Sequence, residues 1–514
     1  MNATSSASPG PGQTWRCGLL IFLAVLALSA PQAALLPLLD RDEPHFAEAS
    51  REMLQSGNFI VPTFNHEPRY NKPPLIYWCQ ALSFTLFGEN AFAARLPSVL
   101  ATAATAWLLF GWGVRFVNKD AGLIAALAYA FCLQTAQQGR VATADALLIF
   151  FMTLTALTGW RLLELTRCTR EQKETAPSQQ GNWNFWGTLL ALGFAGGFLA
   201  KGPEALLPII PLLIGARSCG KPVLASFVAI LLLGLFIASW WGIPALIETH
   251  GDYWHQGMSE GVFTRATNPL QGHGASTFGW YLLGVPLYYP LWAVFGALPL
   301  WPLLVTHRKR LFGAWNPDPM DTYLLLNAGI IVLVFSLMAT KLPHYTLPAF
   351  PFLALLLARR WISAGLSPRL PALLAGGVGI MLALIAAVRI PVALAHHFNP
   401  SPTGELVRAA QADQTLTPGT EFALVDFKEP NAIWEMRRIS ESYGQLIPES
   451  EVIAFLGRPG PHAVVLSAEV WQLLAEKADP TWKTYGTRGW STAKVWDAQK
   501  GDFAFIDLTL VVKP

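Results

Sequence analysis

Charged residues are scarce in this chain. Lys, Arg, Asp and Glu make up 13% of its 514 residues, whereas a soluble domain carries about 25%. The mean hydropathy is +0.37. This composition argues against a soluble cytosolic enzyme, and the formal net charge of +3 is too small to predict a nucleic-acid partner.

Cysteines and the common nucleotide-binding motifs are also missing. The five cysteines have no paired spacing, so neither a disulfide framework nor a cysteine-based zinc site is predicted. The segment GARSCGKP (215–222) matches the first part of a phosphate-binding loop, but Pro222 stands where Ser or Thr must bind magnesium. The chain also lacks HExxH, GxSxG and a dinucleotide fingerprint.

Long apolar runs are abundant up to about residue 392. They are long enough to cross about 30 Å of hydrocarbon. The proline-rich run 278–304 leaves room for one or two more short helices, so we predict a polytopic α-helical membrane protein with about 11–13 transmembrane helices. The eleven predicted spans are 17–37, 92–117, 120–139, 146–165, 184–200, 203–217, 222–242, 278–304, 322–340, 346–359 and 371–392.

The basic residues predict the orientation. With a cytoplasmic N-terminus, every Lys and Arg cluster between spans falls on one side, as the positive-inside rule requires. Residues 38–91 and everything after 392 then lie outside. The first apolar run could instead be a cleaved signal peptide, which would leave the remaining topology unchanged. The clusters are Arg115 and Lys119; Arg161, Arg167, Arg170 and Lys173; Arg217 and Lys221; Arg308, Lys309 and Arg310; Arg359, Arg360 and Arg369.

The composition changes after residue 392. Segments 421–427, 462–467 and 503–512 have the pattern of strands, and 431–439 and 468–477 that of helices. We therefore predict a transmembrane domain over 1–392 and a small α/β domain over 393–514 on the outer face, without a metal-ligand cluster.

The first outer loop has the densest charge near the membrane. Residues 40–57 predict a short helix on the membrane surface, with Asp42 and Glu43 just before Pro44 and Gly57 at its end. Either these acids only cap the helix or they carry chemistry. Arg69 and Lys72 follow on a loop stiffened by a double proline, where they contact lipid headgroups or bind one specific phosphate.

Other outer-face charges lie at the ends of spans. Asp145 begins a span, with Arg140 near enough in sequence to pair with it. Asp145 could also act only as a helix cap. Lys201 starts the turn KGPE. A lysine at a span end commonly snorkels to headgroups, but these are exceptions to the positive-inside pattern. A second group of polar residues lies between two later spans: Lys341, His344 and Tyr345.

These segments resemble a known family. DEPHFAEASREMLQSGNFIVPTFN, YNKPPLIYWCQALSFTLFGENAFAARLPS, RVATADALLIFF and KLPHYTLP are similar to the bacterial aminoarabinose transferases that modify lipid A. More broadly, they resemble the polyprenyl-phosphate-sugar-dependent glycosyltransferases of the protein mannosyltransferase superfamily, which have the GT-C fold. The resemblance is strong over about residues 38–150 and weak in the C-terminal domain.

The resemblance implies roles for single residues. Asp42, Glu43 and Asp145 match the family's acidic positions, and Asp42 is the expected base or acceptor-orienting carboxylate. Asp42 and Asp145 would hold a divalent metal, Mg²⁺ or Mn²⁺, with Zn²⁺ as an alternative. Relatives usually carry Arg-Tyr where this chain has His45-Phe46, so His45 is a weaker phosphate ligand. The expected donor phosphate-binding residues are Lys72, Arg69, Lys201, Tyr345, His344, Lys341 and His45.

The resemblance also implies the reaction. A sugar similar to aminoarabinose would pass from undecaprenyl phosphate to lipid A or another envelope acceptor, with inversion. The site would face the periplasm from the bacterial inner membrane, without an obligate protein partner. The alternatives are a protein O-mannosyltransferase and, from another class, a flippase for lipid-linked sugars. A flippase predicts charges near mid-membrane and repeated halves, and the sequence has neither.

Overall fold

The chain forms two compact units in the computed structural model. The helical unit comprises Met1–Pro31, Tyr70–Ile76 and Arg95–Ala383, and the sheet unit comprises Gln32–Arg69, Tyr77–Ala94 and Leu384–Pro514. The domain boundary predicted near residue 392 lies outside the described residues, as do most of the spans 278–304 and 371–392. The structure describes residues 11–38, 42–171, 178–269, 278–281, 307–308, 318–369, 371, 377, 401–427, 429–486, 492–497 and 502–514.

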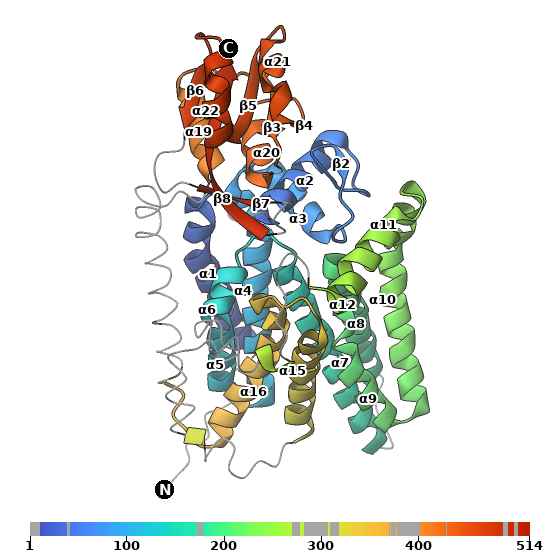
Figure 1. The fold of residues 1–514 in the computed structure, drawn as a ribbon. Coiled ribbons are helices and arrows are strands. Elements are labelled where there is room, and N and C mark those ends of the chain that lie inside the picture. Colours follow the sequence, from blue (N-terminus) through green and yellow to red (C-terminus); the bar gives the residue numbers. More distant parts are fainter. Residues whose placement is uncertain are drawn as a thin grey trace. The chain divides into compact units, whose positions relative to one another are not determined.

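Apolar helices build the helical unit (Figure 1). Within the described ranges, five helices are long and apolar enough to cross a membrane, or six if one bent pair counts as a span. The multi-pass architecture predicted from the apolar runs is therefore confirmed. Its main helices are α1 (Pro11–Leu35), α4 (Ala91–Phe116), α5 (Lys119–Ala130), α6 (Leu133–Gln138), α7 (Asp145–Glu171), α8 (Ser178–Lys201), α9 (Ile209–Cys219), α10 (Lys221–Glu248), α15 (Pro319–Leu337) and α16 (Phe350–Ser363).

Three predicted spans differ in detail from the helices observed. The runs 184–200 and 203–217 form a pair bent by 79°. The break between the two helices follows Leu206 and contains Pro208, which cannot donate a backbone hydrogen bond. The run 120–139 is interrupted after α5 and continues only as the short α6.

A different ion-paired group lies at each end of the helical unit. Asp145 begins α7 and pairs with Lys201. Glu164, about 28 Å further along α7 at 1.5 Å per residue, pairs with Arg115 at 2.9 Å and with Arg161 at 3.1 Å. The predicted cytoplasmic residues of α4 and α7 therefore meet at one end of the unit, and the predicted outer-face pair lies at the other.

A mixed sheet forms the core of the sheet unit. Its strand order is β4-β3-β5-β8-β6, with β7 paired to β8. The β3–β4 and β3–β5 pairs are parallel, whereas β8 runs antiparallel to β5, β6 and β7. Alternate residues of the central strands enter two apolar clusters, one on each face. The strands are β3 (Glu421–Val425), β4 (Gln445–Ile447), β5 (His462–Ser467), β6 (Lys483–Gly486), β7 (Thr492–Asp497) and β8 (Asp502–Lys513).

Helices of the sheet unit flank this sheet. The predictions of strands β3, β5 and β8 and of helices at α20 and α22 are confirmed, whereas strands β4, β6 and β7 were missed. The residues of β4 and β6 are mostly exposed, so they lack an apolar run. The helices are α19 (Pro402–Ala412), α20 (Pro430–Arg437), α21 (Val452–Gly457) and α22 (Ala468–Leu474).

The first outer loop folds largely within the sheet unit. Helix α2 (Asp42–Ser56) is followed by the β1–β2 hairpin (Thr63–Phe64 and Glu67–Pro68) and by α3 (Leu75–Phe87). Gly57 ends α2 with a φ of 71°, as predicted. Unlike a helix lying on a membrane surface, α2 buries polar side chains, among them Glu48, Arg51 and Glu52.

Candidate active site

Three predicted site residues meet in the helical unit. The Lys201 ammonium lies 2.7 Å from Oδ1 of Asp145 and 5.4 Å from the centroid of the Tyr345 ring. Thr143 donates its hydroxyl to Oδ2 of the same carboxylate at 3.0 Å. A cation beside an aromatic face and a carboxylate is well stabilised when water is excluded.

Backbone geometry places these groups. Asp145 is the first residue of α7, and Lys201 ends α8 just before Gly202, which has a φ of 79°. Tyr345 lies in the 3₁₀ segment η5 (Pro343–Ala349) and packs its ring against Phe335. The pairing predicted for Asp145 was with Arg140, but its ion pair is made with Lys201, and Arg140 donates to the Ala136 carbonyl.

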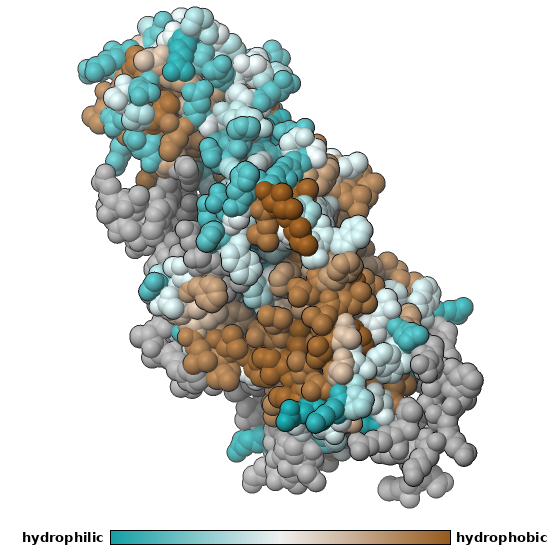
Figure 2. Space-filling view, turned by 90° about the vertical axis from the view of Figure 1, so that its right-hand side faces the viewer, coloured by the Kyte–Doolittle hydropathy of each residue, from teal (hydrophilic) through white to brown (hydrophobic). Residues whose placement is uncertain are grey.

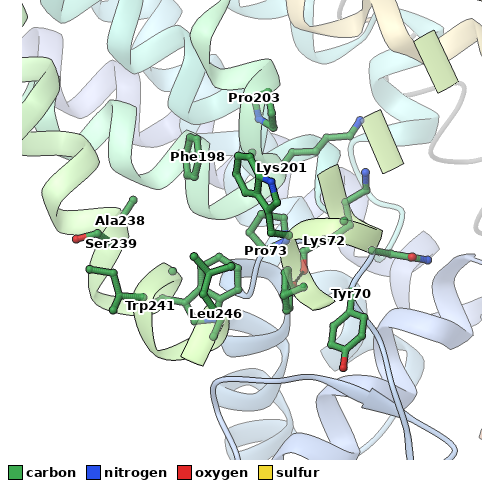
Figure 3. A pocket seen from close by; sticks show the side chains of 18 of the residues that line it. Tyr70, Lys72, Pro73, Phe198, Lys201, Pro203, Ala238, Ser239, Trp241 and Leu246 are labelled. Atoms are coloured by element: carbon green, nitrogen blue, oxygen red, sulfur yellow. Dashed lines mark hydrogen bonds between the residues drawn. The ribbon is translucent and has the colours of Figure 1, made fainter. Parts of the chain in front are cut away.

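A pocket of about 250 Å³ lies next to this group. Lys72 and Lys201 both line it, and most of the remaining lining is apolar. Figure 3 shows the two lysines at one end of the pocket and Ala238 and Ser239 of α10 at the other. An apolar pocket with two ammonium groups at one end matches a ligand that has an anionic head and a hydrocarbon body.

The aromatic residues Tyr70, Trp241 and Tyr253 hold the loop that carries Lys72. Tyr253 of α11 (Asp252–Trp254) donates its hydroxyl to the Lys72 carbonyl. Its ring lies against Tyr70 on one side and Trp241 on the other, at centroid distances of 5.3 and 5.1 Å. Gly257 passes so close that a Cβ there would lie 2.8 Å from the Tyr70 carbonyl. The Lys72 backbone is therefore fixed from α10 and α11.

One wall of the pocket belongs to a helix with an exposed apolar face. On α10, Phe236 is 60% exposed, Trp240 77% and Ile247 70%. Figure 2 shows hydrophobic side chains spread over this face of the helical unit. In a membrane protein such a face contacts lipid, so α10 carries pocket-lining residues on one side and lipid-facing residues on the other.

Four other predicted site residues lie in the sheet unit. Asp42 is exposed in the first turn of α2, and Glu43 beside it is buried. His45 packs against Phe64. Arg69 donates Nε to the Tyr77 hydroxyl at 3.2 Å, and its guanidinium lies over the Phe46 ring. Arg69 is thus held by aromatic groups of its own unit and does not line the lysine pocket.

The last predicted residues flank Tyr345. His344 packs edge-on against the Tyr345 ring. Lys341 is buried and donates its ammonium to the Met338 carbonyl. Burial lowers the pKa of Lys341 from its usual value. Neither residue lines the pocket of Lys72 and Lys201.

The donor set of Asp145 does not match a divalent cation. Both of its oxygens are engaged, one by the Lys201 ammonium and one by the Thr143 hydroxyl, and an ammonium at that position competes with a metal. No group of three His, Cys, Asp or Glu suited to a metal occurs in the part of the chain that the structure describes.

The residues that complete the pocket were not predicted from the sequence. Tyr70, Phe198, Trp241 and Tyr253 all line it. A signal existed in the segment WWGIPALIETHGDYW (240–254), because clustered Trp and Tyr at a span end mark a membrane interface. That signal locates the interface but does not distinguish a pocket wall from a lipid anchor.

Comparisons with known proteins identify the relatives of this chain. A sequence profile of the family described as dolichyl-phosphate-mannose-protein mannosyltransferase matches residues 71–241. An undecaprenyl phosphate-alpha-4-amino-4-deoxy-L-arabinose arabinosyl transferase of Pectobacterium carotovorum subsp. carotovorum is 31% identical over 432 residues, covering 80% of this chain and 71% of that protein. The Erwinia tasmaniensis protein of the same name is 30% identical, covering 69% of this chain and 62% of its own length.

The fold has a solved counterpart. The crystal structure of ArnT from Cupriavidus metallidurans bound to undecaprenyl phosphate matches with a TM-score of 0.70 at 16% identity, over 96% of this chain and 97% of that one. Fold and relatives together define a polytopic membrane glycosyltransferase of the GT-C class. Within that class, the chain belongs to the family of the undecaprenyl phosphate-alpha-4-amino-4-deoxy-L-arabinose arabinosyl transferases.

Proposed function

We propose that the protein transfers 4-amino-4-deoxy-L-arabinose from undecaprenyl phosphate to lipid A on the periplasmic face of the bacterial inner membrane. The observation that carries this proposal is the pocket in which Lys72 and Lys201 lie at one end of apolar walls. The names of the curated relatives supply the sugar and its carrier. The acceptor and the membrane come from the resemblance of the loop motifs.

In this proposal the lysines act on the leaving group. Cleavage of the bond between sugar and phosphate leaves negative charge on the phosphate, and two ammonium groups in a largely apolar pocket stabilise that charge strongly. Asp145 orients Lys201 through their 2.7 Å ion pair, and the Tyr345 ring keeps the ammonium beside its face. The isoprenoid chain would lie along the pocket walls formed by α8 and α10.

The acceptor side of the reaction uses Asp42. An oxygen of the acceptor attacks the sugar, and a carboxylate can orient that group or, where the group is a hydroxyl, accept its proton. Asp42 is exposed at the start of α2, as a group that meets a substrate must be. A single displacement inverts the anomeric carbon. A divalent metal stays a prediction from the resemblance, and activity in EDTA followed by readdition of Mg²⁺ or Mn²⁺ tests it.

Mass spectrometry of lipid A is the decisive experiment. Cells that express the protein should gain lipid A heavier by one aminopentose residue, and cells expressing K72A should not. In detergent, the purified protein should transfer sugar from the undecaprenyl-phosphate donor to lipid A. Unchanged lipid A with sugar on a protein would identify a protein O-glycosyltransferase, and donor movement between leaflets without transfer would identify a flippase.

A further inference from the structure

Helix α2 buries a row of charged side chains inside the sheet unit. Glu48 and Arg51 are 0% exposed and Glu52 is 1% exposed. Residues 48, 52 and 55 are spaced i, i+4 and i+7, so they share one face of the helix. Buried charges are costly unless they are paired. The residue that pairs with this face therefore fixes the position of α2.

That partner is Arg437, the last residue of α20. Its Nη1 donates to Oε1 of Glu48 at 2.5 Å and to Oε1 of Glu52 at 2.8 Å, and its Nη2 donates to Oε1 of Gln55 at 3.0 Å. The guanidinium also lies 4.1 Å from the centroid of the Tyr443 ring. One planar guanidinium therefore spans two turns of α2, which a lysine cannot reproduce.

A second arginine makes a reciprocal contact. Arg51 of α2 donates to Glu48 on its own helix and to the Trp434 carbonyl of α20, the latter at 3.3 Å. Its guanidinium lies 4.6 Å from the centroid of the Trp434 ring. Each helix thus sends one arginine to the other.

The hairpin after α2 is tied to the same region. Glu52 accepts the backbone N–H groups of Asn65 and His66 at 2.6 and 3.1 Å. The Asn65 amide then donates to the Gly444 carbonyl at 2.7 Å and accepts the Gly444 N–H at 2.8 Å. This reciprocal pair fixes the hairpin to the segment between α20 and β4.

We propose that the C-terminal sheet positions α2 through Arg437, which makes Arg437 a positioning residue for Asp42. The inference rests on the proposed function, in which Asp42 is the base. Asp42 lies about 9 Å before Glu48 on the same helix, at 1.5 Å per residue, so a helix that shifts at Glu48 carries Asp42 with it. A misplacement of about 1 Å at a reacting group can cost about 100-fold in rate.

The test compares Arg437→Gln with Arg438→Gln in the full-length protein. Arg438 is the matched control because it is 44% exposed and pairs with Glu435 on its own helix. For R437Q we expect kcat for sugar transfer to fall about 10- to 100-fold. The KM for donor should stay within about twofold, because the donor pocket residues belong to the helical unit and each hydrogen bond there is retained. R437K should fall between R437Q and the wild type, and R438Q should match the wild type.

Amide hydrogen exchange over residues 42–56 gives a readout independent of activity. We expect faster exchange in R437Q and unchanged exchange in R438Q. Wild-type kcat in R437Q, or a lower kcat with unchanged exchange in α2, would overturn the inference. If the wild-type protein transfers no sugar, the proposed function fails, and the exchange data still decide whether Arg437 holds α2.

A second variant keeps the test informative if R437Q does not fold. Asn65→Gly removes the reciprocal pair with Gly444 without leaving a buried charge. Because Asn65 has a φ of 52°, glycine adopts that backbone conformation readily. We expect N65G to lower kcat by about 5- to 30-fold, the effect of about two lost hydrogen bonds, with donor KM retained. Full activity in N65G together with wild-type exchange in α2 would again count against the inference.

Discussion

Lys201 is the residue whose position tells most about the site. It ends a helix at a glycine turn and reaches Asp145, Glu204 at 3.9 Å and the Tyr345 ring. A lysine that only snorkels would extend its ammonium to water. The Lys201 ammonium is instead paired with Asp145 and lies beside the Tyr345 ring, while the residue also lines the pocket, which fits the proposed role in binding phosphate.

Asparagine variants separate catalysis from helix capping. Asn caps a helix about as well as Asp, so D42N and D145N should be nearly silent if these residues are only caps. We expect turnover to fall about 10²- to 10⁴-fold in D42N, as for loss of a general base. D145N should also lose most activity because Lys201 loses the carboxylate with which it pairs. Transfer assays in detergent distinguish the two roles, and melting temperatures control for folding. Near-normal turnover in both variants would show that Asp42 and Asp145 act only as helix caps.

The Lys72 loop gives a graded pair of variants. K72A should raise the donor KM strongly because a charge-assisted contact to phosphate is lost, and K72R should restore it only in part. Y253F removes one hydrogen bond to the Lys72 carbonyl and should raise the donor KM by about 2- to 10-fold. Initial rates at increasing concentrations of the undecaprenyl-phosphate-linked sugar measure the donor KM of each variant. An unchanged KM in K72A would exclude Lys72 from donor binding.

Residue types and local sequence could identify Asp42, Lys72, Asp145, Lys201 and Tyr345 as candidates, because charges near a membrane stand out. The sequence could not predict the ion pair between Asp145 and Lys201. These residues are 56 positions apart in the chain, and their contact depends on how α7 and α8 pack. Nor could the sequence show that Arg69 is engaged by Tyr77 instead of lining the lysine pocket.

Among the elements, α2 has the most unusual environment. Burial raises the pKa of Glu48 from 4.5 to about 7, against the opposing effect of Arg51 and Arg437. The folded protein therefore takes up a proton near pH 7 that the unfolded chain takes up only near pH 4.5. The stabilisation from this proton is complete below the unfolded pKa and is lost as the pH rises through the folded one.

The melting temperature should depend on pH because of this proton uptake by Glu48. Through Glu48, the wild-type protein should become more stable as the pH falls from about 8 to about 5. E48Q stays neutral and should flatten that dependence, whereas E67Q, on the exposed hairpin, should keep it. Melting curves of the detergent-solubilised protein at several pH values make the comparison. Identical pH profiles for wild type and E48Q would show that Glu48 does not titrate in this range.

Elements with strong local signals were predictable and the others were not. The helix α2 and the strand β8 follow from caps, glycine and β-branched runs. The partner of α2 was hidden, because its polar face is indistinguishable in sequence from a face exposed to water. Only the fold shows that Arg437, 389 positions away, neutralises that face.

For the whole molecule, the distribution of basic residues predicts the orientation of the chain in the membrane. Arg115 and Arg161 meet at one end of the helical unit, and we expect that end to be cytoplasmic. Reporter fusions at residues 310 and 400 should then report opposite sides of the membrane, with 400 outside. The same side for both would mean that the chain crosses the membrane an even number of times between them.

The pairing of α2 with α20 also means that α2 is synthesised long before its partner. Glu48 is made 389 residues before Arg437, an interval of about 20–80 s at typical translation rates of about 5–20 residues per second. During that time the polar face of α2 lacks the guanidinium that neutralises it. Under the proposed function, a chain that stops before Arg437 would keep the residues that line the pocket of Lys72 and Lys201 but would lack the side chain that fixes the helix of Asp42.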